Sequence, residues 1–222
     1  MIIGTEVIVS TLIPLLVAFA VSVLLGPFVI PFLRKLKVGQ TERKEGVQSH
    51  LKKAGTPTMG GLIILIAILV GAIFYVGSYP RIIPVLFLTL GFGIIGFLDD
   101  YLKVVLRRSD GLYPKQKMLC QIVVTTIFVV YLILMDPEGL TILIPFTGQV
   151  FDVRWVTVPL CYFAVIGTVN GVNFTDGLDG LASSVTVIVA VFFTVVSLGL
   201  SGGIEPVTAA VTGALLGFLL FN

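Results

Sequence analysis

Charged residues are scarce in this 222-residue sequence: Asp, Glu, Lys and Arg together make up 12% of it, whereas 57% of it is hydrophobic. The mean hydropathy is correspondingly high, at +1.11. A water-soluble domain needs more polar side chains than this to cover its surface, so the composition excludes the soluble globular class. Several apolar runs have the roughly 20 residues that a helix needs to cross a bilayer. We therefore expect an all-α integral membrane protein, a polytopic helical bundle.

Residues typical of zinc and disulfide sites are also scarce. The sequence contains two cysteines, Cys120 and Cys161, and one histidine, His50. The cysteines lie in different predicted helices without zinc-ligand spacing, so we assign them a packing role. We interpret His50 as an interfacial residue and leave it outside the catalytic set. A zinc centre is therefore not expected.

About seven apolar spans are predicted, at approximately 8–32, 59–79, 82–102, 117–135, 155–173, 181–199 and 206–222. The first span lacks the basic leader and cleavage site of a signal peptide, so we expect it to be a structural helix. Pro and Gly interrupt the range 136–154 around TILIPF and QVFDVRW, which predicts a small β-hairpin on the outer surface. We interpret 1–222 as a single transmembrane domain.

The basic residues predict the orientation of this bundle. Seven of them lie in 34–53 and five lie in 103–117, which accounts for twelve of the fourteen Lys and Arg. Both segments follow an odd-numbered span and so lie on one side of the membrane. The positive-inside rule makes that side cytoplasmic and places the amino terminus outside.

Two acidic pairs stand at the predicted cytoplasmic ends of the third and fifth spans. Asp99 and Asp100 belong to GFLDDYLK, and Asp176 and Asp179 belong to TDGLDGL. Acidic residues beside apolar spans are costly and are candidates for function. Adjacent residues point to different sides of a helix, so we expect only one of Asp99 and Asp100 to face the site. Asp176 and Asp179 would share a face if the sixth helix began at TDGLDGL.

A divalent cation would relieve the repulsion between these carboxylates. Oxygen ligands, with Asn170 and Asn173 nearby, favour Mg²⁺, with Mn²⁺ as the alternative, and Mg²⁺ also binds substrate phosphates. A simpler interpretation is that Asp99 pairs with Lys103 one helical turn further on. We favour a metal and phosphate site because both acidic pairs lie on the same side of the membrane.

A third polar segment, HLKKAGTPTMGG, covers residues 50–61. Its Gly and Pro residues interrupt the helical pattern, while Lys53 and Thr58 offer donors for a phosphate or carbonyl oxygen. No GK[ST] follows a strand, so the segment is not a P-loop. Taken alone, it is either part of a binding site or a simple entry to the next helix.

Together, the segments KKAGTPTMGG, GFLDDYLK and NGVNFTDGLDGLA resemble the signature of the polyprenyl-phosphate N-acetylhexosamine-1-phosphate transferases. The motif sequences GTPTMGG and TDGLDGL are most similar to those of the branch whose donor is UDP-MurNAc-pentapeptide. The resemblance covers residues 27–222 and implies transfer of phospho-MurNAc-pentapeptide to undecaprenyl phosphate, which gives lipid I and UMP in bacterial peptidoglycan synthesis. It also implies a Mg²⁺ cofactor, a homodimer among membrane lipids, no nucleic-acid partner, and a plasma-membrane location with a cytoplasmic active site.

The resemblance further implies roles for individual residues by motif position. Asp176 matches the metal-binding aspartate, and Asp99 and Asp100 match a pair argued to hold metal or activate the lipid phosphate. The predicted catalytic set is Asp99, Asp100, Lys103, Lys117 and Asp176. The predicted substrate-binding set is Lys53, Thr58, Asn170, Asn173, Gly177, Leu178 and Asp179. Direct attack by the lipid phosphate and a covalent aspartyl intermediate both stay open, and we prefer direct attack.

Two alternatives to this function stay open on sequence grounds. A sister enzyme that transfers GlcNAc-1-phosphate from UDP-GlcNAc is distinguished only by the residue sequences of its motifs. An ion-coupled transporter would also gather acidic residues and broken helices, but here the acids lie at one face and no inverted repeat is evident. The family pattern continues beyond GALLGFLLFN with further spans and motifs, so we expect this sequence to be part of a longer protein.

Overall fold

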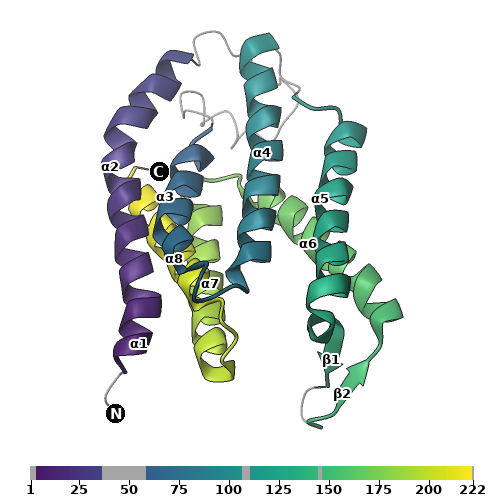
Figure 1. Ribbon diagram of the computed structural model, residues 1–222. Coiled ribbons are helices and arrows are strands. Elements are labelled where there is room, and N and C mark those ends of the chain that lie inside the picture. The colour runs from purple at the N-terminus through teal and green to yellow at the C-terminus, as the bar shows by residue number, and fades with distance from the viewer. Residues whose placement is uncertain (1–3, 37–58, 107–110, 145–146, 222) are drawn as a thin grey trace.

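The computed structural model describes residues 4–36, 59–106, 111–144 and 147–221. They form a helical bundle with one two-stranded sheet (Figure 1). The first half contains α1 (Thr5–Val7), the π-helix η1 (Ile8–Leu12), α2 (Ile13–Leu36), α3 (Gly61–Ala72), the 3-10 helix η3 (Ile73–Tyr75) and α4 (Ile82–Leu106). The second half contains α5 (Pro114–Met135), the 3-10 helix η4 (Pro137–Leu140), β1 (Thr141–Leu143), β2 (Val150–Asp152), α6 (Arg154–Thr175), α7 (Leu181–Leu200) and α8 (Glu205–Leu219).

The predicted helical membrane-protein class is confirmed. The helical stretches in the described residues that are long and apolar enough to cross a membrane are Thr5–Lys35, Ile82–Val104, Pro114–Met135, Arg154–Thr175 and Leu181–Leu200. The predicted spans 59–79 and 206–222 are also helical, but the helices Gly61–Tyr75 and Glu205–Leu219 are shorter than the spans expected there. Hydropathy therefore located the helices and overestimated the length of these two.

Large apolar side chains cover the outside of the bundle. Trp155, Phe163 and Phe174 on α6 are each more than three-quarters exposed, and Phe28 on α2 is similarly exposed. A water-soluble protein rarely exposes so many large apolar side chains. In a bilayer, lipid tails or further helices cover such a surface, so the exposure agrees with a multi-pass membrane protein.

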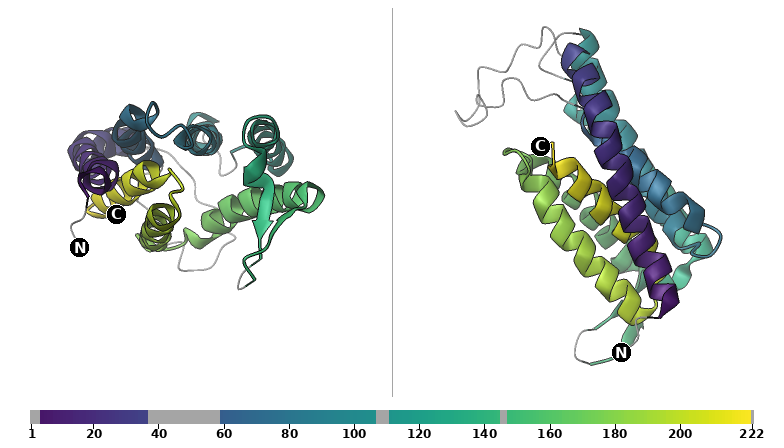
Figure 2. Two further views of the ribbon diagram at one scale, coloured as in Figure 1. Left: turned by 60° about the horizontal axis from the view of Figure 1, so that its bottom comes forward. Right: turned by 90° about the vertical axis from the view of Figure 1, so that its left-hand side faces the viewer.

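The core lies where α8 packs against α2, α3 and α7 (Figure 2). Lipid tails are as apolar as the helices themselves, so close backbone approach through small residues replaces the hydrophobic driving force. At Gly213 on α8 a Cβ atom would overlap the carbonyl oxygen of Leu15 on α2. The fully buried alanines of this core are Ala18, Ala67, Ala72, Ala210 and Ala214.

The predicted hairpin is present within 136–154. β1 and β2 pair antiparallel, with Ile142 opposite Phe151. The hairpin lies between the end of α5 and the start of α6, at the same end of the bundle as the start of α1 (Figure 1). The end of α4, the start of α5 and the turn between α6 and α7 lie toward the opposite end. The directions of α4, α5 and α6 therefore place Asp99, Asp100, Lys103, Lys117 and Asp176 toward one end of the bundle.

Candidate active site

An ion network occupies the last turns of α4. The Lys103 ammonium lies 2.8 Å from an Asp99 carboxylate oxygen and 2.9 Å from an Asp100 oxygen. Lys117, in the first turn of α5, places its Nζ 3.9 Å from the same Asp99 oxygen. The Asp99 side chain is 13% exposed and that of Asp100 is 30% exposed. Asp99 is therefore the more buried member of the pair, and it is the one that joins α4 to α5.

The connection into α5 holds this arrangement in place. The Leu112 amide donates a 2.9 Å hydrogen bond to Asp99 Oδ1. Gly111 lies so close to Asp99 that an added Cβ would overlap its carbonyl and carboxylate groups. α5 then begins with Pro114, a residue suited to the first helical position, and the Tyr113 amide donates to the Gln116 side chain. This start of the helix sets Lys117 beside Asp99.

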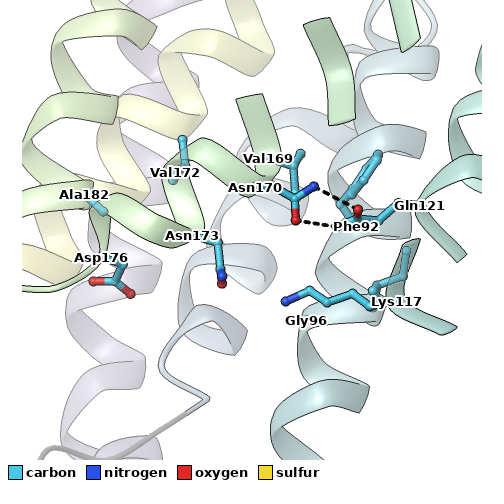
Figure 3. Close-up of a pocket in the computed structure, with 11 residues that line it drawn as sticks. Phe92, Gly96, Lys117, Gln121, Val169, Asn170, Val172, Asn173, Asp176 and Ala182 are labelled. Carbon is cyan, nitrogen blue, oxygen red and sulfur yellow. Dashed lines mark hydrogen bonds between the residues drawn. The ribbon is translucent and has the colours of Figure 1, made fainter. Parts of the chain in front are cut away.

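A cavity of about 260 Å³ lies between α4, α5, α6 and α7 (Figure 3). Ligand pockets for drug-sized molecules are roughly 300–1,000 Å³, so this cavity is large enough for a small polar group but not for a whole drug-sized ligand. Its apolar lining comes from Phe92, Ile95, Gly96, Val169, Val172 and Ala182. Its polar lining comes from Lys117, Gln121, Asn170, Asn173 and Asp176.

Helix geometry explains why the polar residues of α6 meet in this cavity. Asn170 and Asn173 are three residues apart on α6 and therefore share a face. Asp176 follows at the end of the same helix, where the α-helical backbone stops. In Figure 3, Lys117 reaches from α5 toward the space into which Asn173 points. One ammonium group thus faces carboxylate and amide oxygens across the cavity.

A buried pair of amides joins α5 to α6 at the same level. The Asn170 Nδ2 donates to Gln121 Oε1 at 2.9 Å, and Gln121 Nε2 lies 3.4 Å from Asn170 Oδ1. Gln121 is 1% exposed. Sequence reasoning missed this residue, although an amide one helical turn after Lys117 in an apolar helix is a recognisable signal.

The TDGLDGL motif forms a turn between α6 and α7. α7 begins at Leu181, so the shared helical face considered for Asp176 and Asp179 does not form. Gly180 has a φ of 74°, a left-handed conformation that glycine adopts readily and that separates the two helices. Gly177, Leu178 and Asp179, which belong to the predicted substrate-binding set, lie in this turn and are not among the residues lining the cavity.

The side chains that could bind the predicted metal ion are one carboxylate and several amides. Among the residues that the structure describes, no three His, Cys, Asp or Glu side chains converge on a point that could hold a metal ion. Lys103 pairs with both Asp99 and Asp100, and neither of these aspartates lines the cavity that Asp176 lines. The cavity itself offers the Asp176 carboxylate and the amides of Asn170 and Asn173. One carboxylate with further oxygen donors fits Mg²⁺, which binds proteins through few carboxylates and completes its shell with water and phosphate oxygens.

The structure therefore brings together part of the predicted site. Lys117, Asn170, Asn173 and Asp176 line one cavity, and Lys117 connects that cavity to Asp99. Asp100 and Lys103 complete the ion network on α4. Lys53, Thr58 and the whole of 37–58 lie outside the described residues, as does His50. The roles assigned to all these residues stay predictions.

Comparison with known proteins agrees with the motif resemblance. The profile of glycosyl transferase family 4 matches residues 82–222, and the phospho-N-acetylmuramoyl-pentapeptide-transferase signature 1 matches residues 53–65. A phospho-N-acetylmuramoyl-pentapeptide-transferase of Acetivibrio thermocellus is 49% identical over 211 residues, which are 93% of this chain and 63% of that protein. Proteins of the same name from Clostridioides difficile and Bacillus pumilus are 44% and 45% identical, and the matches cover 93% and 98% of this chain.

The chain spans only part of these relatives, from 63% of the Acetivibrio protein to 65% of the Clostridioides protein and 67% of the Bacillus protein. The family match is nevertheless continuous through the helices that build the cavity, because α4, α5, α6 and α7 all lie within residues 82–222. The chain therefore belongs to glycosyl transferase family 4 and, within that family, to the phospho-N-acetylmuramoyl-pentapeptide-transferases.

Proposed function

We propose that the protein containing this chain transfers phospho-MurNAc-pentapeptide from UDP-MurNAc-pentapeptide to undecaprenyl phosphate, with lipid I and UMP as products. The observation that carries this proposal is the cavity in which Lys117 faces Asn173 and Asp176 between four helices of a membrane bundle. A cationic group opposite oxygen ligands is suited to a pyrophosphate and its counter-cation. The names of the relatives specify the sugar and peptide.

The position of the cavity suits two substrates of opposite solubility. Asp176 lies at the end of α6 and Lys117 near the start of α5, where apolar helices give way to polar segments. A water-soluble nucleotide reaches this level from the aqueous side, whereas a lipid phosphate reaches it from within the bilayer. The positive-inside rule assigns this side to the cytoplasm, so we propose a bacterial plasma-membrane enzyme with a cytoplasmic active site.

Phosphoryl transfer requires mainly alignment and charge neutralisation from the protein. We assign to Lys117 the binding of the donor pyrophosphate and to Asp176, with Asn170 and Asn173, the binding of Mg²⁺. When bound, Mg²⁺ neutralises negative charge on the phosphates. Asp99 orients Lys103 and Lys117 through the ion pairs described above.

The reaction we favour is a direct displacement. An oxygen of the lipid phosphate forms a bond to the β-phosphorus of the donor, and the bond from that phosphorus to the bridging oxygen breaks as UMP leaves. The attacking oxygen is anionic near neutral pH, so no strong general base is required. We assign Gly177, Leu178 and Asp179, together with Lys53 and Thr58, to recognition of the nucleotide sugar. The family resemblance also predicts a homodimer, which light scattering in detergent tests.

The test of this function uses the full-length protein in detergent with undecaprenyl phosphate and Mg²⁺. UMP release is compared between UDP-MurNAc-pentapeptide and UDP-GlcNAc as donors. We expect release from the muramyl donor only, and a loss of about 100-fold in kcat for Asp176→Asn, comparable with removal of a charge-stabilising group at a reacting centre.

Other results would change the assignment. Release from UDP-GlcNAc alone would move the protein to the sister branch with the same chemistry. Absence of release from either donor by folded full-length protein would contradict the transferase proposal and favour an ion-coupled transporter. Asp176→Asn with unchanged activity would remove Asp176 from the metal site.

A further inference from the structure

Gln121 is the most deeply buried polar side chain of the cavity lining. It is 1% exposed and lies on α5 one helical turn after Lys117. A buried amide needs hydrogen-bond partners, and Gln121 finds them in Asn170 of α6. The pair therefore crosses between the two helices that carry the ammonium and the oxygen ligands of the proposed site.

The hydrogen bonds of Asn170 determine which way its amide group points. Nδ2 donates to Gln121 Oε1 at 2.9 Å and to the backbone oxygen of Ile166 at 2.8 Å. An amide nitrogen carries two hydrogens, and these two acceptors use both. A reversed amide would set Oδ1 against two acceptor oxygens, which is repulsive. The only contact of Oδ1 among these bonds is the long one, 3.4 Å, from Gln121 Nε2.

The amide oxygen of Asn170 consequently keeps accepting capacity on the cavity side. Figure 3 shows this oxygen on the side of Asn173 and Lys117, with the nitrogen turned toward Gln121. An oxygen in this position binds a cation or an N–H donor and repels a phosphate oxygen. If Gln121 lost its acceptor oxygen, one Asn170 hydrogen would lose its partner and the amide could present N–H to the cavity instead.

We propose that Gln121 is a positioning residue that fixes the Asn170 amide with its oxygen toward the cavity, so that Asn170 serves as a cation ligand. The assignment rests on the proposed function of the cavity, because it gives Asn170 its role beside Asp176. In this proposal Gln121 acts through Asn170 and not through a contact of its own with substrate or cation. Its effect is exerted through the orientation of one neighbouring side chain.

The test uses Mn²⁺ alone as a paramagnetic probe, with its Kd for the full-length protein in detergent measured by electron paramagnetic resonance. Gln121→Met keeps the length of the side chain and removes both polar atoms. We expect it to weaken Mn²⁺ binding about tenfold or more, in the range found for residues that orient metal ligands. The matched control is Thr125→Val, one turn further along the same buried face of α5 and away from the cavity lining, which should leave the Kd unchanged.

A double-mutant cycle with Asn170→Asp separates positioning from packing. A carboxylate presents oxygen in either orientation, so Gln121→Met should change the Mn²⁺ Kd less than threefold in the Asn170→Asp background. Equal effects of Gln121→Met in both backgrounds would overturn the proposal, because additivity indicates independent structural roles. An unchanged Kd in Gln121→Met alone would overturn it as well.

Two further readouts keep the result decisive. If Gln121→Met does not fold, Gln121→Glu, which retains an acceptor at the same length, carries the test, and a tenfold loss of Mn²⁺ binding in that variant would overturn the proposal. UMP release by the wild-type protein is measured in the same preparation. If the wild type releases no UMP while Gln121→Met still weakens Mn²⁺ binding, the proposed function fails and the positioning role stands.

Discussion

Asp99 is the residue on which the charges at the end of α4 converge. Its carboxylate accepts from the Leu112 amide and lies within ion-pair distance of Lys103 and Lys117. Asp100 contacts Lys103 and is more exposed. Exposed ion pairs contribute at most about 1 kcal/mol, whereas a partly buried carboxylate shared by two cations orients both. The two adjacent aspartates should therefore differ in importance.

Replacing Asp99 and Asp100 by asparagine, one at a time, tests this difference in importance. In Asp99→Asn we expect kcat for UMP release to fall about 100-fold, because Lys117 loses the carboxylate that orients it toward the phosphates. In Asp100→Asn we expect a loss below about tenfold, because Lys103 keeps Asp99 as its partner. Kinetics of the two full-length variants at saturating Mg²⁺ provide the comparison. A larger loss in Asp100→Asn would reverse the assignment of the inward-facing residue.

At the level of single residues, the sequence predicted the polar side chains better than their partners. The pairing of Asp99 with Lys103 follows from a spacing of four residues, and the structure has both this bond and the link to Lys117. The Gln121–Asn170 pair joins positions 49 residues apart, and no local spacing predicts such a contact. The predicted spans left 174–180 as a connection, but a helix start at TDGLDGL stayed open because a pattern of DG pairs fits both a helix start and a turn.

Helix packing on the other side of the bundle depends on glycine. Gly213 and Gly217 of α8 face the backbone of α2, where an added Cβ would meet the carbonyl oxygens of Leu15 and Phe19. Backbone atoms cannot move aside as a flexible side chain does, so the two helices would have to separate. These glycines set the distance between α2 and α8.

A substitution at Gly213 tests the packing of α8 against α2. Gly213→Ala should destabilise the protein by about 1–3 kcal/mol, the usual cost of inserting a methyl group into a full interface. The control is Gly199→Ala on α7, where an added Cβ meets nothing within 4 Å. Thermal unfolding in detergent measures both variants. An equal melting temperature for the two would show that the α2–α8 interface relaxes without cost.

At the level of elements, hydropathy predicted where the helices lie and patterning predicted the hairpin. It could not predict that Glu205 at the start of α8 is buried, with 7% of it exposed. That burial depends on the Ser197 hydroxyl of α7, which donates to Glu205 Oε2 at 2.6 Å. A charge at a helix end looks the same in the sequence whether it faces water or a neighbouring helix. Tertiary contacts decide between the two.

For the whole molecule, α8 joins the early and late parts of the chain because it packs against α2, α3 and α7. We therefore propose that 1–222 form a single transmembrane domain, as the sequence predicts. The bundle has one end that carries the hairpin and another that carries the ion network and the turn after α6 (Figure 1). Which of these two ends faces the cytoplasm is a property of the molecule as a whole.

Cysteine labelling in spheroplasts tests the sidedness. Thr147 lies in the hairpin loop and Lys115 in the first turn of α5, and both are exposed. After Cys120 and Cys161 are replaced by serine, a membrane-impermeant maleimide should label Thr147→Cys in intact spheroplasts, because the positive-inside rule places the hairpin outside. Lys115→Cys should be labelled only after permeabilisation. Labelling of both variants in detergent provides the control, and the reverse pattern would place the active site outside.

The unequal burial of the helices also has a consequence for biosynthesis. α8 has ten buried residues among its fifteen, whereas α6 has one, Thr157. A ribosome makes α2 and α3 long before α8, so their small-residue faces enter the bilayer without the helix that covers them. Lipid tails, or an insertase that shields these faces, must occupy the gap until α8 arrives and displaces them. The synthesis of α8 thus sets the moment during translation at which the early helices acquire their final neighbours.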